Sequence, residues 1–203
     1  MLDKIFWLGH SSVKITGEAI LYIDPWKIEG GEEADIILVS HSHHDHLSPE
    51  DVKKIQKEGT VIVTTEDCVT GLSGDVRVAK AGDELHIGGV KVEAVPSYNM
   101  NKAFHPKSSA WIGFIVTMGG KRIYYCGDTD FIPEMREIEA DIVIIPVGET
   151  YTMTADEAAG AVNVINPEAA IPIHYGDIVG SIEDAERFRD LAECRVEIKP
   201  VSR

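Results

Sequence analysis

The sequence predicts a mixed α/β fold in which helices pack outside stacked β-sheets. Short apolar runs bounded by glycine or aspartate recur along the chain, as strands require. Helix-start signals follow such runs in both halves of the chain, which is the alternation expected for helices covering sheets. The hydrophobic fraction of 44% and the charged fraction of 26% are ordinary for a globular protein. Because no linker or composition shift interrupts the pattern, we expect a single domain over residues 1–203.

The first half of the chain predicts five strands and one helix. The strands are expected at residues 4–8, 12–15, 20–23, 35–40 and 60–64. The run 35–40 is continuously apolar, which predicts a strand buried on both faces. A helix is expected from Ser48 to about Glu58, because serine caps a helix and Pro49 suits its first turn.

The second half predicts a meander followed by another alternation of strands and helices. The meander comprises residues 76–79, 84–87, 90–95, 112–117 and 121–126, with the pairs Gly88-Gly89 and Gly119-Gly120 as tight hairpin turns. Further strands are expected at 141–146, 169–173 and 195–199. Helices are expected from Thr154 to about Ile165, where Thr154 and Glu157 form a capping-box pattern, and over 181–193.

Charge and cysteine content narrow the range of partners. The chain carries 19 basic and 34 acidic residues, a formal net charge of −15, so it has no general attraction for nucleic acid or anionic lipid. No apolar run approaches the roughly 20 residues of a membrane-spanning helix. Cys68, Cys126 and Cys194 are few and far apart, which fits a reducing compartment. We expect a cytoplasmic protein that acts on a small molecule, with no nucleic-acid or membrane partner.

The segment His41-Ser42-His43-His44-Asp45-His46 contains four of the eight histidines of the chain. It directly follows the predicted buried strand 35–40, and a strand-to-helix loop is a common place for a site in α/β folds. His41 and His43 are two residues apart, so in extended backbone they point the same way and can bind one ion. Asp45 and His46 lie where the chain turns and can face a second ion. The alternative is a solvated loop that chelates metal only incidentally.

The remaining ligands should come from other strand ends. Asp128 follows the strand that ends at residue 126, His174 follows the strand 169–173, and His105 lies in the loop after residue 95. Taken alone, Asp128 could equally form a turn and His174 could equally terminate its strand. Imidazole with carboxylate suits zinc, and also iron or manganese.

Together these motifs resemble the metallo-β-lactamase superfamily. The motif His41-x-His43-x-Asp45-His46 is similar to the central metal motif of that superfamily. The segments Leu21-Tyr22-Ile23-Asp24-Pro25, Gly127-Asp128-Thr129 and Ile173-His174-Tyr175 resemble its other metal motifs, in the same order. The opening Leu8-Gly9-His10-Ser11-Ser12 looks like the compact branch related to ascorbate-6-phosphate lactonase.

The resemblance implies a four-layer αββα sandwich with two divalent ions at one edge, zinc being favoured over manganese or iron. One ion would bind His41, His43 and His105; the second would bind Asp45, His46 and His174, with Asp128 between them. Many members have a histidine directly after the strand that here ends at Val95, whereas this chain has Pro96-Ser97-Tyr98. Either the first ion lacks that ligand or His105 replaces it, and we favour His105.

The implied activity is hydrolysis of a small ester, lactone or phosphodiester by a metal-bridging hydroxide. Asp45 would steer the hydroxide, and His10 is a candidate substrate contact or proton donor, although it could simply be a buried loop histidine. Asp24 is expected to orient a ligand imidazole. Lys102 and Lys107 could bind an anionic group of the substrate, but surface lysines are more often solvated.

Two other classes of function stay open. The first is an iron-dependent redox enzyme of the same fold. The diiron flavoproteins of the superfamily usually have a glutamate where this chain has His43, and no flavin-binding segment is visible. The second is a metal-binding module without catalytic activity.

Overall fold

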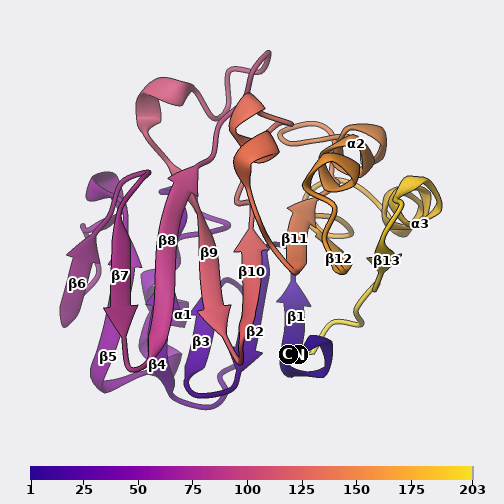
Figure 1. Cartoon of the computed structure of the whole chain (residues 1–203). Coiled ribbons are helices and arrows are strands. Elements are labelled where there is room, and N and C mark those ends of the chain that lie inside the picture. The colour runs from indigo at the N-terminus through magenta and orange to yellow at the C-terminus, as the bar shows by residue number, and fades with distance from the viewer. Residues whose placement is uncertain (203) are drawn as a thin grey trace.

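The computed structural model describes residues 1–202 and contains two β-sheets packed face to face, with helices on the outer sides (Figure 1). The first sheet contains, in spatial order, β1 (Ile5–Gly9), β2 (Ser12–Thr16), β3 (Ile20–Ile23), β4 (Ala34–Leu38), β5 (Gln56–Thr64) and β6 (Asp75–Val78). The second contains β13 (Arg195–Val196), β12 (Ala169–Ile173), β11 (Ile142–Pro146), β10 (Lys121–Tyr125), β9 (Ile112–Met118), β8 (Val90–Pro96) and β7 (Glu84–Ile87).

Both sheets follow the same plan. Each begins with antiparallel strands, β1–β3 in the first sheet and β7–β10 in the second, and continues with parallel strands. The parallel part runs from β3 to β6 and from β10 to β13. Parallel neighbours end at the same edge of their sheet, so the loops that follow them can meet there.

Three α-helices cover the sheets: α1 (Pro49–Ile55), α2 (Ala155–Ile165) and α3 (Ile182–Leu191). Ser48 caps α1 by accepting from the backbone N–H of Asp51, and Thr154 and Glu157 form the expected capping box of α2. Short 3₁₀ helices lie at Leu2–Lys4, Glu66–Cys68, Lys107–Ser109 and Pro133–Glu137. Among the described residues, no helix has the length and apolar character that crossing a membrane requires.

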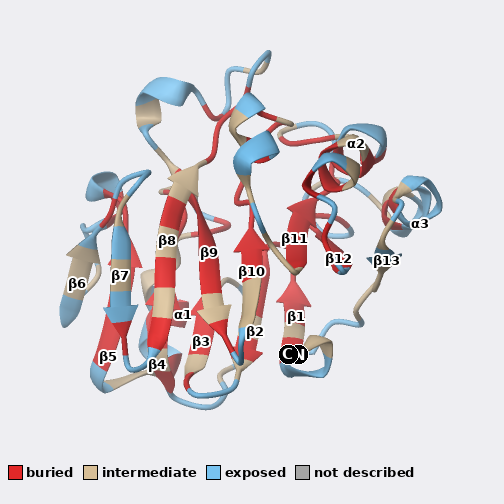
Figure 2. Cartoon of the chain, in the orientation of Figure 1, coloured by how far each residue is buried: buried red, intermediate tan, exposed pale blue. Residues whose placement is uncertain are grey.

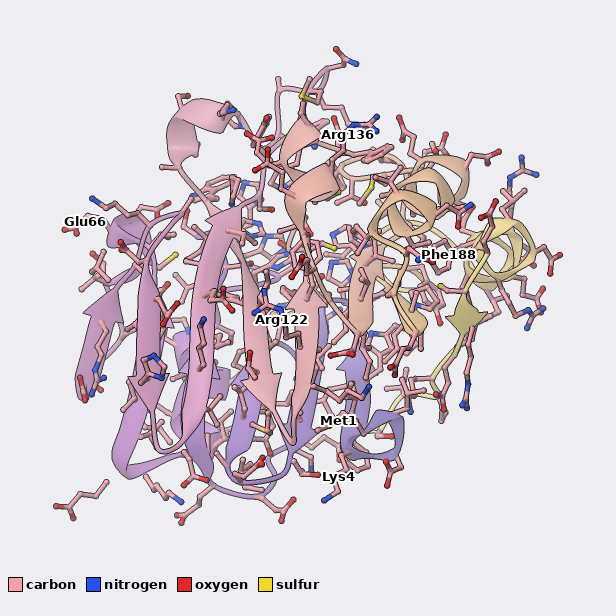
Figure 3. All side chains as sticks on the ribbon, in the orientation of Figure 1. Met1, Lys4, Glu66, Arg122, Arg136 and Phe188 are labelled. Atoms are coloured by element: carbon pink, nitrogen blue, oxygen red, sulfur yellow. The ribbon has the colours of Figure 1, made fainter. Side chains whose placement is uncertain are left out.

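The hydrophobic core has two parts, which define the layers (Figure 2). The larger part joins the two sheets and continues to α2 and α3, where Phe188 is fully buried and lies on the side of α3 that faces β12 (Figure 3). The smaller part lies between α1 and the first sheet and includes Val52 and Ile62. In β4, Ile36 belongs to the larger part and Ile37 to the smaller, so this strand is buried on both faces as its apolar run predicts. The layer order is therefore helix, sheet, sheet, helix, the predicted αββα sandwich.

Two predicted element boundaries need correction, and one predicted strand lies in the other sheet. The first helix ends at Ile55 instead of Glu58, because Gln56 is already extended and pairs with Ala34 as the start of β5. The last strand contains only Arg195 and Val196 of the expected residues 195–199.

The strand near residue 76 does not belong to the meander. It forms β6 and pairs in parallel with β5, from Val61 opposite Asp75 to Thr64 opposite Val78. The chain then crosses to the second sheet, where the meander begins with β7. The short apolar run predicted the strand, but the sheet that it joins depends on pairing with β5, which lies elsewhere in the chain.

The outer face of the meander carries polar side chains. Arg122 of β10 donates from Nη1 to Glu93 of β8 at 2.7 Å (Figure 3). At the upper edge of Figure 1, the loops after β8, β10 and β11 lie close together above the sheets. This edge holds the histidine and aspartate cluster.

Candidate metal centre

The loop between β4 and α1 brings the central motif to this edge of the sandwich. His41 and His46 are fully buried in it, while His43 and Asp45 face a cavity. The loop is fixed at its start, where the backbone N–H of Ser40 donates to Asp24 at 2.7 Å. Its end is fixed by the capped first turn of α1.

The first group of candidate ligands consists of His41, His43 and His105. Their ring nitrogens lie within 4.8 Å of one another, and His41 Nε2 is 3.2 Å from His43 Nδ1. His105 comes from the loop after β8 and is only 1% exposed. The structure therefore places His105 beside the two histidines of the central motif.

The second group consists of Asp45, His46 and His174, together with His10. Their ligand atoms also lie within 4.8 Å of one another, and all four residues are buried. His174 follows β12 and adopts a left-handed backbone conformation with φ of 61°. His10 and Asp24 likewise have positive φ, 48° and 46°, a concentration of unusual backbone that is typical of functional sites.

Asp128 lies between the two groups. Its Oδ1 is 3.3 Å from His46 Nε2, and its Oδ2 is 3.2 Å from His105 Nε2 and 3.1 Å from His174 Nε2. These three ring nitrogens are buried and make no hydrogen bond among the described residues. Buried polar atoms are normally paired. Unpaired imidazole nitrogens around a shared carboxylate are the kind of donor atoms that would coordinate two divalent cations.

Asp24 anchors the candidate ligands His46 and, through Ser40, His41. Its carboxylate is fully buried and accepts from Ser40 N, Ser40 Oγ, His46 Nδ1 and Tyr125 Oη at 2.6–2.7 Å. Because Nδ1 of His46 donates to Asp24, its Nε2 is the ring atom that would bind an ion. Ser40 donates its hydroxyl proton to Asp24, so its oxygen accepts from His41 Nδ1 at 2.9 Å, and the Nε2 of His41 is likewise left free.

His10 is buried and does not line the cavity. Its Nε2 lies 2.9 Å from Asp45 Oδ2, and burial lowers the pKa of His10 although the Asp45 carboxylate opposes that shift. A neutral His10 therefore donates through Nε2 to Asp45. This position favours orientation of Asp45 over the substrate contact or proton donation that the sequence suggested.

The electrostatics of the cluster suit metal binding. Burial holds the pKa of His41 well below its usual value, and burial also lowers that of His43, so both rings are neutral at pH 7. Burial alone would raise the pKa of Asp128, but the charges of His174 and His46 outweigh it and hold this pKa well below its usual range. Burial would lower the pKa of His46, but the carboxylates of Asp128 and Asp24 outweigh it and raise this pKa well above its usual value, so His46 carries a proton that a bound ion would displace. His41, His43 and Asp128 are already in the neutral and ionised forms that coordinate metal ions.

A cavity of about 240 Å³ opens onto the cluster at His43, Asp45, His105 and Asp128. Its other wall is formed by His44, Phe104, Tyr151 and Ile178. Tyr151 thus lines the cavity, whereas Tyr175 stacks on Trp7 with ring centroids 4.7 Å apart.

The two lysines suggested as anion binders make other contacts. Lys102 donates to Asp130 at 2.7 Å, and Lys107 donates to Glu134 at 2.9 Å and lies over the ring of Tyr98. Neither lysine lines the cavity.

Sequence reasoning missed several residues that contact the candidate ligands or Asp24. Ser40 and Tyr125 bind Asp24, and Asn99 binds His105. Trp111 packs 4.8 Å from the His41 ring and donates to Asp67 at 2.8 Å. Of these residues, only Ser40 could have been found from the sequence, because it lies next to His41. Tyr125, Asn99 and Trp111 are far from the central motif in the chain and reach the cluster only in the folded structure.

A model of the β-lactamase superfamily domain matches residues 4–174. The chain belongs to the metallo-β-lactamase superfamily. Within the superfamily it is similar to proteins named UPF0173 metal-dependent hydrolase. The relative from Caldivirga maquilingensis is 34% identical over 203 residues, covering 92% of this chain and 88% of the relative. The relative from Thermoplasma acidophilum is 33% identical, covering 93% and 90%.

Solved structures of related folds agree with this architecture. A metal-dependent hydrolase of Parabacteroides distasonis is 33% identical, with a TM-score of 0.87 over 98% of this chain and 93% of that one. A metallo hydrolase of Ignicoccus hospitalis shares the fold at 20% identity, with a TM-score of 0.80 over 98% and 95%. These comparisons confirm the αββα fold and the class of metal-dependent hydrolases. The resemblance to the ascorbate-6-phosphate lactonase branch stays a prediction.

Proposed function

We propose that this protein is a dinuclear metal-dependent hydrolase that cleaves a small ester, lactone or phosphodiester. The observation that carries the proposal is the position of Asp128, whose two carboxylate oxygens face ring nitrogens from both ligand groups. A carboxylate in this position can bridge two ions. Zinc is the metal we favour, with manganese or iron as alternatives, because the donors are imidazole and carboxylate.

The proposed ligand sets follow the two groups. His41, His43 and His105 would hold the first ion, and Asp45, His46 and His174 would hold the second, with Asp128 shared. When bound, such a pair of ions supplies an activated water and polarises the oxygen of the substrate. No nucleophilic side chain is then required.

The protein residues have separate tasks in this reaction. Asp45 lies at the cavity with one oxygen held by His10, so its other oxygen can orient the attacking water. The water oxygen bonds to the carbonyl carbon or phosphorus, the bond to the leaving oxygen breaks, and that oxygen takes up a proton. Asp24 fixes the orientation of the His46 ring, and Asn99 fixes that of the His105 ring, so that both rings stay directed at the ions.

The test is metal content per chain, measured by elemental analysis on the wild type and on Asp128→Ala. We expect two ions in the wild type and a clear reduction in the variant, together with metal-dependent hydrolysis in a screen of esters, lactones, thioesters and phosphodiesters. Asp156→Ala is the control, because Asp156 is an exposed residue of α2 that pairs with Arg187. A wild type that binds no metal even after reconstitution would overturn the proposal.

The same measurement separates the other candidate functions. Bound iron would shift the assignment to the redox enzyme of this fold. Two tightly bound ions without turnover of any substrate class would favour a non-catalytic metal-binding module. For location and partners, we propose a cytoplasmic enzyme that acts on a small molecule.

A further inference from the structure

The cavity joins a polar floor to an apolar wall. The floor is the ligand cluster, and its charged members are Asp45 and Asp128. On the wall, Phe104 and Tyr151 meet edge to face with ring centroids 4.7 Å apart. Phe104 is 47% exposed and Ile178 is 39% exposed, so apolar surface faces solvent directly beside the proposed ions.

The apolar wall is connected to the ligand cluster. The backbone carbonyl of Tyr151 accepts from Asn99 Nδ2 at 3.0 Å, and Asn99 also holds His105. Phe104 immediately precedes His105 in the chain. A group bound against these rings therefore lies beside the first ligand group, where the reacting bond must be.

Among residues 1–202, no lysine or arginine lines the cavity. Lys102 and Lys107 flank Phe104 and His105 in the chain and contact Asp130 and Glu134 at 2.7 and 2.9 Å. Lys27 contacts Asp177, the residue before Ile178, at 2.9 Å. Arg136, in the upper part of Figure 3, lies over the ring of Phe131 with its Cζ 5.6 Å from the ring centroid. His44, which also lines the cavity, lies with its Nδ1 3.7 Å from Asp45 Oδ1. A phosphate or carboxylate on the non-reacting part of a substrate would find no lysine or arginine among the described lining residues and would face the negative charge of Asp45.

We propose that the non-reacting group of the substrate is neutral and apolar, and that a single aromatic ring against Phe104, Tyr151 and Ile178 fits best. The cavity volume of about 240 Å³ lies below the range of drug-sized pockets, which limits the ligand to about one ring with a short reacting group. This inference rests on the proposed hydrolase function and names the substrate class of that same site.

Metal-chelating probes test the inference without turnover. Acetohydroxamate, benzohydroxamate and the hydroxamate of succinic acid share the chelating group and differ by a methyl group, a neutral ring or a carboxylate. Calorimetric titration of the zinc-loaded protein measures their affinities. We expect benzohydroxamate to bind at least about tenfold more tightly than acetohydroxamate, because binding against Phe104, Tyr151 and Ile178 removes the apolar surface of the phenyl ring from water. The carboxylated probe should bind no more tightly than acetohydroxamate.

Variants of the wall make the test specific. Phe104→Ala should remove most of the advantage of the ring and leave the affinity for acetohydroxamate unchanged. Phe104→Lys should raise the affinity for the carboxylated probe. Val164→Ala is the matched control, because Val164 is an exposed apolar residue of α2 that does not line the cavity.

The outcomes separate the two proposals. Tighter binding of the carboxylated probe than of benzohydroxamate, or equal binding of all three probes, would overturn the substrate class even if esters are hydrolysed. Preference for the ring probe without hydrolysis of any substrate would support the binding site and overturn the hydrolase. A protein that binds no zinc would overturn both.

Discussion

The side-chain oxygen of Asn99 accepts hydrogen bonds from both the backbone N–H and the Nδ1 of His105, each at 3.0 Å. The amide orientation is determined by its other end, where Nδ2 donates to Asp130 Oδ1 and to the backbone oxygen of Tyr151 at 3.0 Å. Both of these atoms only accept, so the amide oxygen must face His105. His105 is thereby protonated at Nδ1 and presents the lone pair of Nε2 toward Asp128.

This relationship predicts that Asn99→Leu weakens metal binding. The leucine keeps a similar size but leaves Nδ1 of the His105 ring without its acceptor, so the ring can turn away from His41 and His43. We expect the affinity for one of two ions to fall by about 10–100-fold. Zinc titration against a competing chelator measures the change. Asn101→Leu is the control, because Asn101 is exposed in the same loop; equal affinity in both variants would contradict the role of Asn99.

Asp24→Asn should reduce both metal affinity and stability. The amide offers one acceptor oxygen and adds two donors opposite Ser40, His46 and Tyr125, which already donate. We expect a loss of about 10–100-fold in metal affinity and about 3–5 kcal/mol in the free energy of unfolding of the metal-free protein. Tyr125→Phe, which removes only one donor, should cost about 1 kcal/mol. Chemical denaturation compares the two, and a smaller loss for Asp24→Asn than for Tyr125→Phe would refute the anchoring role.

Gly148→Ala should displace His174 from the cluster. A Cβ at this position would overlap the backbone oxygen of His174 and lie 2.9 Å from Val179 and 3.0 Å from His174 Nδ1. We expect loss of one ion by elemental analysis. Gly160→Ala is the matched control: its Cβ would meet only Phe131 at 3.8 Å, and helix propensity predicts a gain of up to about 1 kcal/mol in α2. Full metal content in Gly148→Ala would show that the backbone around His174 relaxes to accept the added Cβ, and would contradict the prediction.

Asp51 predicts an acid-dependent loss of stability. Burial raises its pKa, but hydrogen bonds from Lys54 Nζ and from the backbone N–H of Lys27 outweigh burial and hold the pKa below 3.8. The unfolded chain therefore binds the proton more readily, so the contribution of Asp51 is fully present above pH 3.8 and disappears as the pH falls through the folded-state pKa.

The matching experiment compares wild type and Asp51→Asn by denaturation between pH 7 and pH 3. The difference in unfolding free energy should be about 1–3 kcal/mol and constant down to about pH 5, and should shrink below pH 3.8. A difference that grows on acidification would contradict the assigned direction of the pKa shift.

The sequence by itself determined the local features of this protein. Apolar runs located the strands, capping residues located the helix starts, and the glycine pairs located the hairpin turns. The spacing of His41, His43, Asp45 and His46 predicted the central motif. All of these signals depend on neighbours within a few residues, so they can be detected in the sequence alone.

Only the tertiary structure decided which distant residues meet. It paired β6 with β5, brought His105 to His41 and His43, buried His10 behind Asp45, and paired Lys102 with Asp130. Each of these outcomes depends on contacts between segments far apart in the chain, where burial and hydrogen-bond satisfaction act on the whole fold. Charge and loop position offered Lys102 and Lys107 as possible anion binders, although solvated lysines were the favoured interpretation. In the structure, Asp130 and Glu134 pair with them, and Phe104, Tyr151 and Ile178 line the cavity.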